Sequence, residues 1–427
     1  MDILLVLVFA LAYVAITLEH SLQLNKSAPA LVGAVLLWVL HGLHLGDAAM
    51  LNQQLSESLV ATAQIVFFLM GAMTIVEVMD AHQGFDCITS RIRTSKLSSL
   101  MWLVGMVTFF MSALLDNLTT AIVMVSLMKK LLAEREDRLL FAGLIVIAAN
   151  AGGAWSPIGD VTTTMLWIGG QVTAWGIVQA LLLPSLVAVL LPLALLSWQL
   201  RGQVVQAPEP SQHATQPEHG PWMLALGLGL LLLVPVFKTV TGLPPFMGML
   251  LGLGLLWLVS DLLHKTKPDE DKAHLTLAHS LSRIDMASLT FFMGILLAVA
   301  VLEHAHILSN LATWLDTVVG RQDLIVLLIG LISAVVDNVP LVAASMGMYS
   351  LSNFPSDSFL WAFMAYCAGT GGSVLVIGSA AGVAAMGLEK ISFFWYVRRI
   401  SGLALLGYFA GAFMYILQFN FTHGASP

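Results

Sequence analysis

The feature that most constrains this chain is its series of long, nearly uncharged apolar blocks. They cover residues 3–18, 59–79, 97–115, 177–198, 222–237 and 400–417. Charged residues make up only 10% of the 427 residues, against about 25% in an average soluble domain. A transmembrane barrel would instead show short segments of alternating hydrophobicity. We therefore expect an all-α polytopic membrane protein, with about 10–13 transmembrane segments of about 20 residues each.

The distribution of lysine and arginine orients these segments. Alternating the sides of successive spans places 16 basic residues in cytoplasmic segments and leaves Lys238 and Arg321 outside, as the positive-inside rule expects. Lys26 belongs to the cytoplasmic set, and both chain termini face outward. The linker at 200–220 is rich in Pro, Gln and His, which predicts a mobile connection between two halves. The formal net charge of −7, with no basic stripe, argues against nucleic-acid binding and leaves the lipid bilayer as the expected partner.

The chain contains an internal repeat. SALLDNLTTAIVM at 112–124 corresponds to SAVVDNVPLVAAS at 333–345. Downstream, NAGGAWSPIGDVTTT at 150–164 corresponds to GTGGSVLVIGSAAGV at 369–383. The corresponding strings follow in the same order, and nearly the same number of residues separates each string from its counterpart. We therefore infer a tandem duplication. The predicted domains are N-terminal scaffold helices at 1–58, a first repeat at 59–199, linker and scaffold helices at 200–282, and a second repeat at 283–420.

The positions of the basic residues indicate that the two copies of the repeat have opposite orientations in the membrane. Basic residues flank the first Asp-Asn element on both sides, whereas Arg321 is the only basic residue in 284–389. We therefore predict two re-entrant hairpins, at 97–131 and 321–351, that enter from opposite faces and carry Asp116 and Asp337 at their tips. The alternative is that each hairpin is a pair of full spans with its aspartate near the far surface.

Broken helices are predicted after each hairpin, at 139–170 and 357–389. Glycine and proline interrupt apolar stretches there and free backbone groups that must find partners inside the membrane. For a single glycine, a kink or a close helix contact is the better explanation, but here the glycines cluster beside polar residues. Inverted repeats with interrupted segments at matching positions are typical of secondary transporters, whose site lies near the midplane.

The tips and breaks supply candidates for an ion and proton site. Ionisable groups at bilayer depth are costly and mark function by default, although an aspartate can also serve as a helix cap or a structural pair. No Lys or Arg lies close to these aspartates in sequence. The oxygen donors suit a monovalent hard cation, and the carboxylates are too few for a calcium cage. The candidates are Ser112, Asp116, Asn117, Thr119, Thr120, Asn150, Ser156, Asp160, Thr162, Thr163, Thr164, Ser333, Asp337 and Asn338.

These carboxylates also predict a coupling mechanism. Burial can bring the pKa of an aspartate into the physiological range. A protonated carboxyl group no longer offers a negative charge to a cation, whereas the ionised group does. A proton and a cation would therefore compete for one group, which is what obligatory exchange requires at the site.

The four strings resemble the signatures of NhaD-type sodium/proton antiporters, a family of the ion transporter superfamily. The resemblance extends from about residue 59 to 420. It implies a multi-pass homodimer in a bacterial inner (plasma) membrane that exchanges cytoplasmic Na⁺ or Li⁺ for external protons, for sodium and pH homeostasis. It implies no enzymatic activity and no cofactor beyond the transported ions. It adds Ser373 and Ser379 to the site, and it assigns Na⁺ to Asp116, Asn117, Asp337 and Asn338.

The same sequence prompts two other functions, and it argues against both. A sodium-coupled symporter of a dicarboxylate, or an arsenite permease, would use the same fold, but the two tip carboxylates would repel a dianion. The string Ile158-Gly159-Asp160 resembles part of the Gly-x-Gly-Asp motif of intramembrane aspartyl proteases. However, Pro157 replaces the first glycine of that motif, and the chain has no Tyr-Asp motif to pair with it.

A second set of titratable residues lies near the ends of the helices that precede each hairpin. Histidine titrates near neutral pH and suits a pH sensor, although polar residues at a membrane interface need no such role. The candidates for a proton path or pH sensing are Glu77, Asp80, His82, Glu303 and His306.

Overall fold

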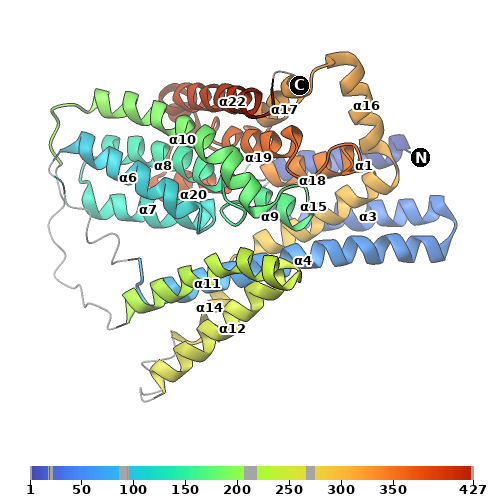
Figure 1. Cartoon of the computed structure of the whole chain (residues 1–427), viewed down its shortest axis with the longest axis horizontal. Helices are drawn as coiled ribbons and strands as arrows, with labels where there is room; N and C mark the ends of the chain where they lie inside the picture. Colours follow the sequence, from blue (N-terminus) through green and yellow to red (C-terminus); the bar gives the residue numbers. More distant parts are fainter. Residues whose placement is uncertain are drawn as a thin grey trace.

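The computed structural model describes residues 2–17, 19, 23–85, 94, 96–205, 219–265 and 275–424. Over these residues the chain is α-helical, and the only extended pairing is an isolated bridge between Lys96 and Val204 (Figure 1). The predicted all-α fold class is confirmed. Most of the predicted linker, at 206–218, lies outside the described residues.

Eight of the described helices are long and apolar enough to cross a membrane. The longest, α4, has 34 residues and a length of about 51 Å, which exceeds the hydrocarbon core of about 30 Å. Its polar first turns therefore extend beyond the membrane. The eight are α3 Ser27–Leu45, α4 Ala48–Ala81, α8 Arg135–Ala154, α10 Ala174–Gln199, α11 Gly220–Thr241, α12 Pro245–His264, α15 Met286–His304, and the continuous helix of α21 Phe393–Tyr396, the π-helical turn η2 Val397–Ser401 and α22 Gly402–His423.

Two hairpins enter the bundle from opposite ends. The first consists of α6 (Leu97–Ser112) and α7 (Asn117–Leu131), and the second of α17 (Gln322–Ile332) and α18 (Asn338–Met348). Their arms have at most 16 residues, about 24 Å, so an arm is shorter than the hydrocarbon core. Figure 1 shows their tips at the centre of the molecule, as re-entrant hairpins require.

Two broken helices follow the hairpins and run in opposite directions. In the first repeat α8 ends at Ala154 and α9 (Val161–Ile168) resumes after the break. In the second repeat α19 (Phe359–Gly371) is followed by α20 (Ala380–Glu389). The inverted repeat with two hairpins and two broken helices is therefore the observed architecture.

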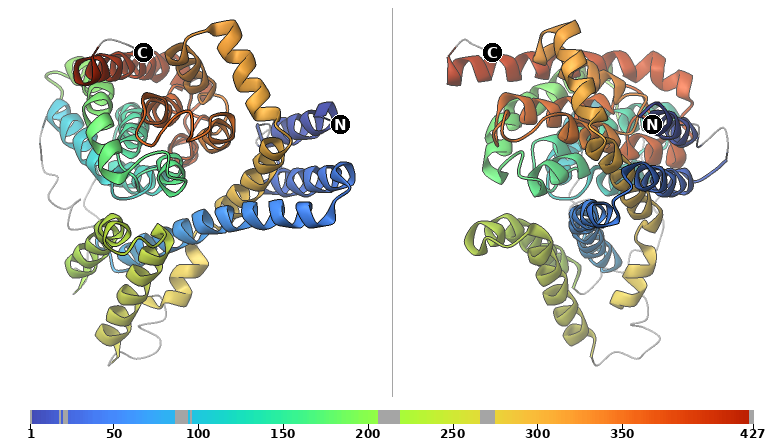
Figure 2. Two further views of the ribbon diagram at one scale, coloured as in Figure 1. Left: turned by 45° about the vertical axis from the view of Figure 1, so that its right-hand side comes forward. Right: turned by 90° about the vertical axis from the view of Figure 1, so that its right-hand side faces the viewer.

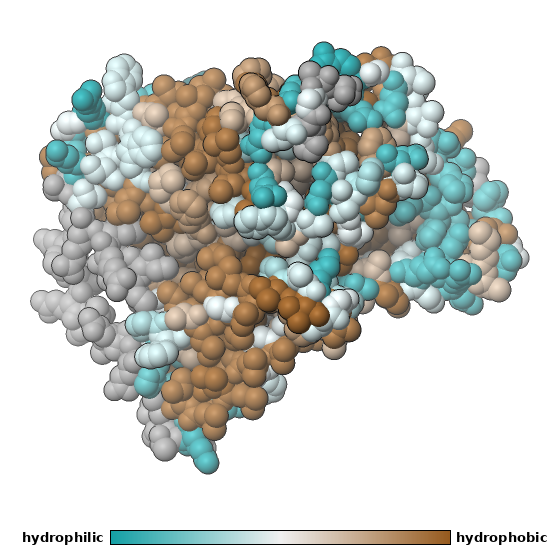
Figure 3. Space-filling view, viewed as in Figure 1, coloured by the Kyte–Doolittle hydropathy of each residue, from teal (hydrophilic) through white to brown (hydrophobic). Residues whose placement is uncertain are grey.

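The helices form two layers (Figure 2). The hairpins and broken helices pack with α10 and α22 into one bundle, and α4, α11, α12 and α15 lie against it as a second layer. The short helix α14 (Leu277–Arg283) precedes α15, and α16 (Ile307–Val319) connects α15 to the second hairpin. Apolar side chains cover the face over α11 and α12 (Figure 3), as expected of a lipid-facing surface. The exposed apolar residues of these two helices include Leu233, Val236, Leu251 and Leu258.

The N-terminal segment makes a contact that the sequence does not predict. Helices α1 (Asp2–Thr17) and α3 pack side by side, and Lys26, the N-cap of α3, contacts the tip of the second hairpin. The assignment of Lys26 to a cytoplasmic segment stays a prediction, whereas its contact with a hairpin tip was not predicted. The positive-inside rule counts basic residues in loops and cannot detect a turn that folds back to a carboxylate far away in sequence.

Candidate functional site

Four helices begin at the centre of the bundle, and each has a polar N-cap. Asp116 caps α7, Asp160 caps α9, Asp337 caps α18 and Ser379 caps α20. Each side chain accepts a hydrogen bond from a first-turn N–H group that has no partner within its helix. The helix N-termini also help to stabilise ionised carboxylates. The two repeats thus match cap by cap, except that the second break has a hydroxyl group where the first has a carboxylate.

Asp160 lies where the two hairpins meet, and only 2% of it is exposed. Its Oδ2 accepts a hydrogen bond of 2.8 Å from Nδ2 of Asn117 and a longer one of 3.5 Å from Nδ2 of Asn338. Its Oδ1 accepts hydrogen bonds from the backbone N–H and the hydroxyl of Thr162, at 2.8 and 2.6 Å. One carboxylate therefore contacts the residue that follows each tip aspartate.

Asn150 connects the first broken helix to the second. Its Oδ1 accepts a hydrogen bond of 3.0 Å from Asn117, and its Nδ2 donates to Oγ of Ser373 at 2.9 Å and of Ser379 at 2.8 Å. Asn150 is fully buried. The two serines, which only the family resemblance placed at the site, thus lie in one network with residues of the first repeat.

Three further hydroxyl candidates hold the backbone rather than a carboxylate. Ser112 and Ser333, at matching hairpin positions, donate hydrogen bonds of 2.6 and 2.8 Å to backbone carbonyls of the adjacent broken helices. Thr163 donates to the carbonyl oxygen of Asp160 at 2.9 Å. These contacts fix the hairpins to the breaks, so they position the site.

Two glycines let the hairpins approach the breaks closely. A Cβ atom at Gly159 would lie 2.5 Å from the carbonyl oxygen of Ser112, and one at Gly378 would lie 2.8 Å from that of Ser333. Neither distance leaves room for a methyl group, because interiors are close-packed. The two repeats therefore use the same backbone contact.

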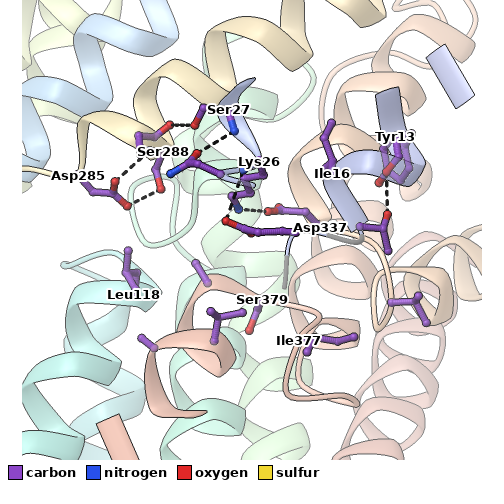
Figure 4. A pocket seen from close by; sticks show the side chains of 18 residues that line it. Tyr13, Ile16, Lys26, Ser27, Leu118, Asp285, Ser288, Asp337, Ile377 and Ser379 are labelled. Carbon is purple, nitrogen blue, oxygen red and sulfur yellow. Dashed lines mark hydrogen bonds and ion pairs between the residues drawn. The ribbon is translucent and has the colours of Figure 1, made fainter. Parts of the chain in front are cut away.

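The two tip aspartates face different cavities. Asp116 and Asp160 line a cavity of about 20 Å³ against α4, beside Phe68 and Leu69. This volume suits one water-sized particle. Asp337 and Ser379 line a larger cavity of about 310 Å³ that α1, α3 and α15 complete (Figure 4). The fully buried Asp160 lies between the two tips.

Asp116 and Asp337 also differ in their partners. Asp116 accepts hydrogen bonds from the backbone N–H and the hydroxyl of Thr119, at 2.8 and 2.6 Å. Asp337 accepts a hydrogen bond of 3.3 Å from the N–H of Val339 and pairs with Nζ of Lys26 at 2.8 Å. Sequence reasoning missed Lys26 because 311 positions separate it from Asp337, and its N-terminal segment has no counterpart in the repeat.

The predicted proton-path residues lie away from this network. Glu77 pairs with Arg283 at 2.8 Å, and His82 stacks on His264 with their Nε2 atoms 2.9 Å apart. Both contacts are at the end of α4 or just beyond it, where Asp80 also lies. Glu303 and His306 are exposed at the end of α15 and the start of α16. The structure does not bring these five residues to the three aspartates.

The donor set suits a small hard cation. Amide and hydroxyl groups from Asn117, Thr162 and Asn338 contact the Asp160 carboxylate, and the oxygens of such groups are the usual ligands of hard cations. Within the described parts of the chain, no three His, Cys, Asp or Glu residues form a group that could hold a metal ion. The carboxylate, amide and hydroxyl groups around Asp160 have the chemistry to bind a hard cation or a proton.

Comparison with known proteins supplies the family. A family model described as citrate transporter matches residues 11–369. Sodium/proton antiporter 1 of Arabidopsis thaliana is 50% identical over 98% of this chain and 73% of its own length. Sodium/proton antiporter 2 of the same plant is 47% identical over 97% of this chain and 99% of its own length. The Na⁺/H⁺ antiporter NhaD of Vibrio cholerae is 33% identical over 96% of this chain and 90% of its own length. This chain belongs to the NhaD-type sodium/proton antiporter family.

Membership in the NhaD-type family confirms the resemblance seen in the four motifs. A solved structure agrees on the fold: the YdaH transporter of Alcanivorax borkumensis matches with a TM-score of 0.61 at 14% identity, over 94% of this chain and all of that one. The chain is thus a multi-pass membrane protein of a transporter family.

Proposed function

We propose that this protein is a secondary active transporter that exchanges cytoplasmic Na⁺ or Li⁺ for external protons. The named activities of its relatives support this proposal. The structural observation that carries it is Asp160, one buried carboxylate that the amides of Asn117 and Asn338 contact from opposite hairpins. A charge change on this group would act on both hairpins at once.

In this proposal the three aspartates share the two transported ions. Na⁺ binds oxygens of Asp116, Asn117, Asp337 and Asn338, and Asp160 holds either a proton or part of the charge that attracts the cation. The amides of Asn117 and Asn338 donate to Asp160 through Nδ2, so their Oδ1 atoms can bind the cation while these hydrogen bonds persist.

Anion symport is the competing function, because the matching family model is described as citrate transporter. Two tip carboxylates and Asp160 would oppose an approaching dianion, and Lys26 already pairs with one of them. Cation exchange is the better fit. A homodimer, the absence of catalysis and a bacterial inner-membrane location remain parts of the proposal that rest on the family resemblance; the relatives named above come from a plant and a bacterium.

Proteoliposomes that hold a pH gradient test this proposal. A pH-sensitive dye reports proton movement when Na⁺, Li⁺, K⁺ or succinate is added, from mildly acidic to alkaline pH. We expect Na⁺ and Li⁺ alone to dissipate the gradient, with a larger response at higher pH. No response to either cation, together with Na⁺-dependent succinate uptake, would contradict cation exchange and support symport.

A further inference from the structure

Lys26 brings a tethered positive charge to one of the two tip aspartates. Its Nζ lies 2.8 Å from Oδ2 of Asp337 (Figure 4). The same atom lies 4.3 Å from the ring centroid of Phe291. Among the residues that the structure describes, no Lys or Arg forms an ion pair with Asp116, the counterpart in the first repeat. The two copies of the tip therefore differ by one built-in cation.

We propose that Lys26 competes with the transported cation for Asp337. Its ammonium group binds this carboxylate in the unloaded protein, and it must leave before Na⁺ or Li⁺ can bind there. The proposal rests on the proposed exchange function and deepens it, because it makes Lys26 a determinant of the cation affinity.

The backbone contacts show that Lys26 is held at this place. Ser27 donates its hydroxyl to the carbonyl oxygen of Ala287 at 2.6 Å, and its N–H to Oδ1 of Asn25 at 2.9 Å. Further along α3, Trp38 donates to the carbonyl oxygen of Leu297 at 3.0 Å. Helix α3 is thus fixed on α15, and this fixes the point from which the lysine side chain extends.

Helix stability does not explain a lysine at this position. Lys26 is the N-cap of α3, forms no side-chain cap and places a cation at the positive end of the helix dipole, which is unfavourable. The gain from this lysine must come from its partner, Asp337. The side chains of the pair are 23% and 19% exposed, so the pair is accessible from the cavity.

The cavity gives the displaced ammonium group a place to go. It measures about 310 Å³, and Glu19 and Asp285 line it together with Lys26 and Asp337. Tyr13 of α1 also lines it. A lysine has a flexible stem and three rotatable donors, so it can move to another acidic side chain when a cation takes Asp337.

Four proteins reconstituted in liposomes test the proposal at alkaline pH: wild type, Lys26→Gln, Lys26→Arg and Lys238→Gln. Removal of the competing charge should lower the half-saturating Na⁺ concentration of Lys26→Gln by roughly three- to tenfold, with the maximal rate retained. Lys26→Arg keeps the charge and should keep the wild-type value. Lys238 is the matched control, because it also lies over an aromatic ring but donates to the carbonyl oxygen of Trp167.

A binding measurement supports the transport data without depending on them. The Na⁺ dependence of the unfolding midpoint in detergent should shift to lower concentrations in Lys26→Gln by the same factor. An unchanged or higher half-saturating concentration in Lys26→Gln would overturn the proposal, and so would a well-inserted Lys26→Gln protein that neither binds Na⁺ nor exchanges it. A wild-type protein without Na⁺- or Li⁺-driven proton movement would instead contradict the exchange function itself.

Discussion

At the scale of single residues, the three aspartates each perform two tasks. As N-caps they satisfy backbone N–H groups of α7, α9 and α18, a task that asparagine and serine perform equally well. As carboxylates they place negative charge at the centre of a membrane protein, which capping alone does not require. An exchange of aspartate for asparagine therefore separates the two tasks.

We predict that Asp116→Asn and Asp337→Asn each abolish cation exchange, because each keeps the cap and removes the charge. Their stability should fall by at most about 0.5 kcal/mol, since asparagine caps helices as well as aspartate does. Reconstituted transport and thermal unfolding in detergent measure the two effects. Asp47→Asn is the control, because Asp47 caps α4 on an exposed surface. Full activity in either tip variant would contradict the site assignment.

At the scale of elements, the hairpins and broken helices depend on close backbone contacts. Gly159 lies against the carbonyl oxygen of Ser112 in the first repeat, and Gly378 lies against that of Ser333 in the second. A side chain at either position would push a hairpin tip, with its aspartate, away from the break. The distance between Asp160 and the two tip residues depends on these contacts.

Gly159→Ala and Gly378→Ala should therefore both impair exchange strongly and lower stability by about 1–3 kcal/mol, the usual cost of overpacking. Gly387→Ala is the matched control in α20, because a Cβ atom there meets no neighbour within 4 Å. Exchange rates and unfolding midpoints measure the outcome. Wild-type exchange in both variants would mean that the hairpins and breaks do not need this contact.

The same elements show which parts of the structure the sequence predicts and which it does not. The duplicated strings predict the paired hairpins and breaks because both copies preserve spacing, glycine and aspartate. The network around Asp160 and Asn150 joins residues that these strings already contain. The pair of Lys26 with Asp337 is different: it joins an N-terminal turn without a repeat counterpart to a tip 311 positions away. Local spacing carries no information on such a contact.

At the scale of the whole molecule, the two layers suggest which parts move. The hairpins, the broken helices, α10 and α22 form one bundle, and α4 with α11, α12 and α15 forms the layer against it. Asp116 and Asp160 face α4, whereas Asp337 faces α1, α3 and α15. Movement of the bundle against this layer would change which cavity is open, as alternating access requires.

A reversible cross-link between the layers should therefore arrest exchange. Phe68 of α4 and Trp167 of α9 have ring centroids 6.2 Å apart, so cysteines at these positions are within reach of a short thiol cross-linker. With Cys87 and Cys367 replaced by serine, we expect cross-linking of Phe68→Cys/Trp167→Cys to stop exchange and reduction to restore it. Each single-cysteine variant is the control. Undiminished exchange in the fully cross-linked protein would exclude movement at this contact.

The most direct test of the central claim, that a proton and a cation compete for the same buried carboxylates, is proton release on cation binding. Na⁺ is added to the purified protein in weakly buffered detergent solution while the pH is recorded. We expect Na⁺ and Li⁺ to release protons from the wild-type protein, K⁺ to release none, and Asp160→Asn to release fewer or none. Saturable Na⁺ binding without any proton release would contradict competition at this site.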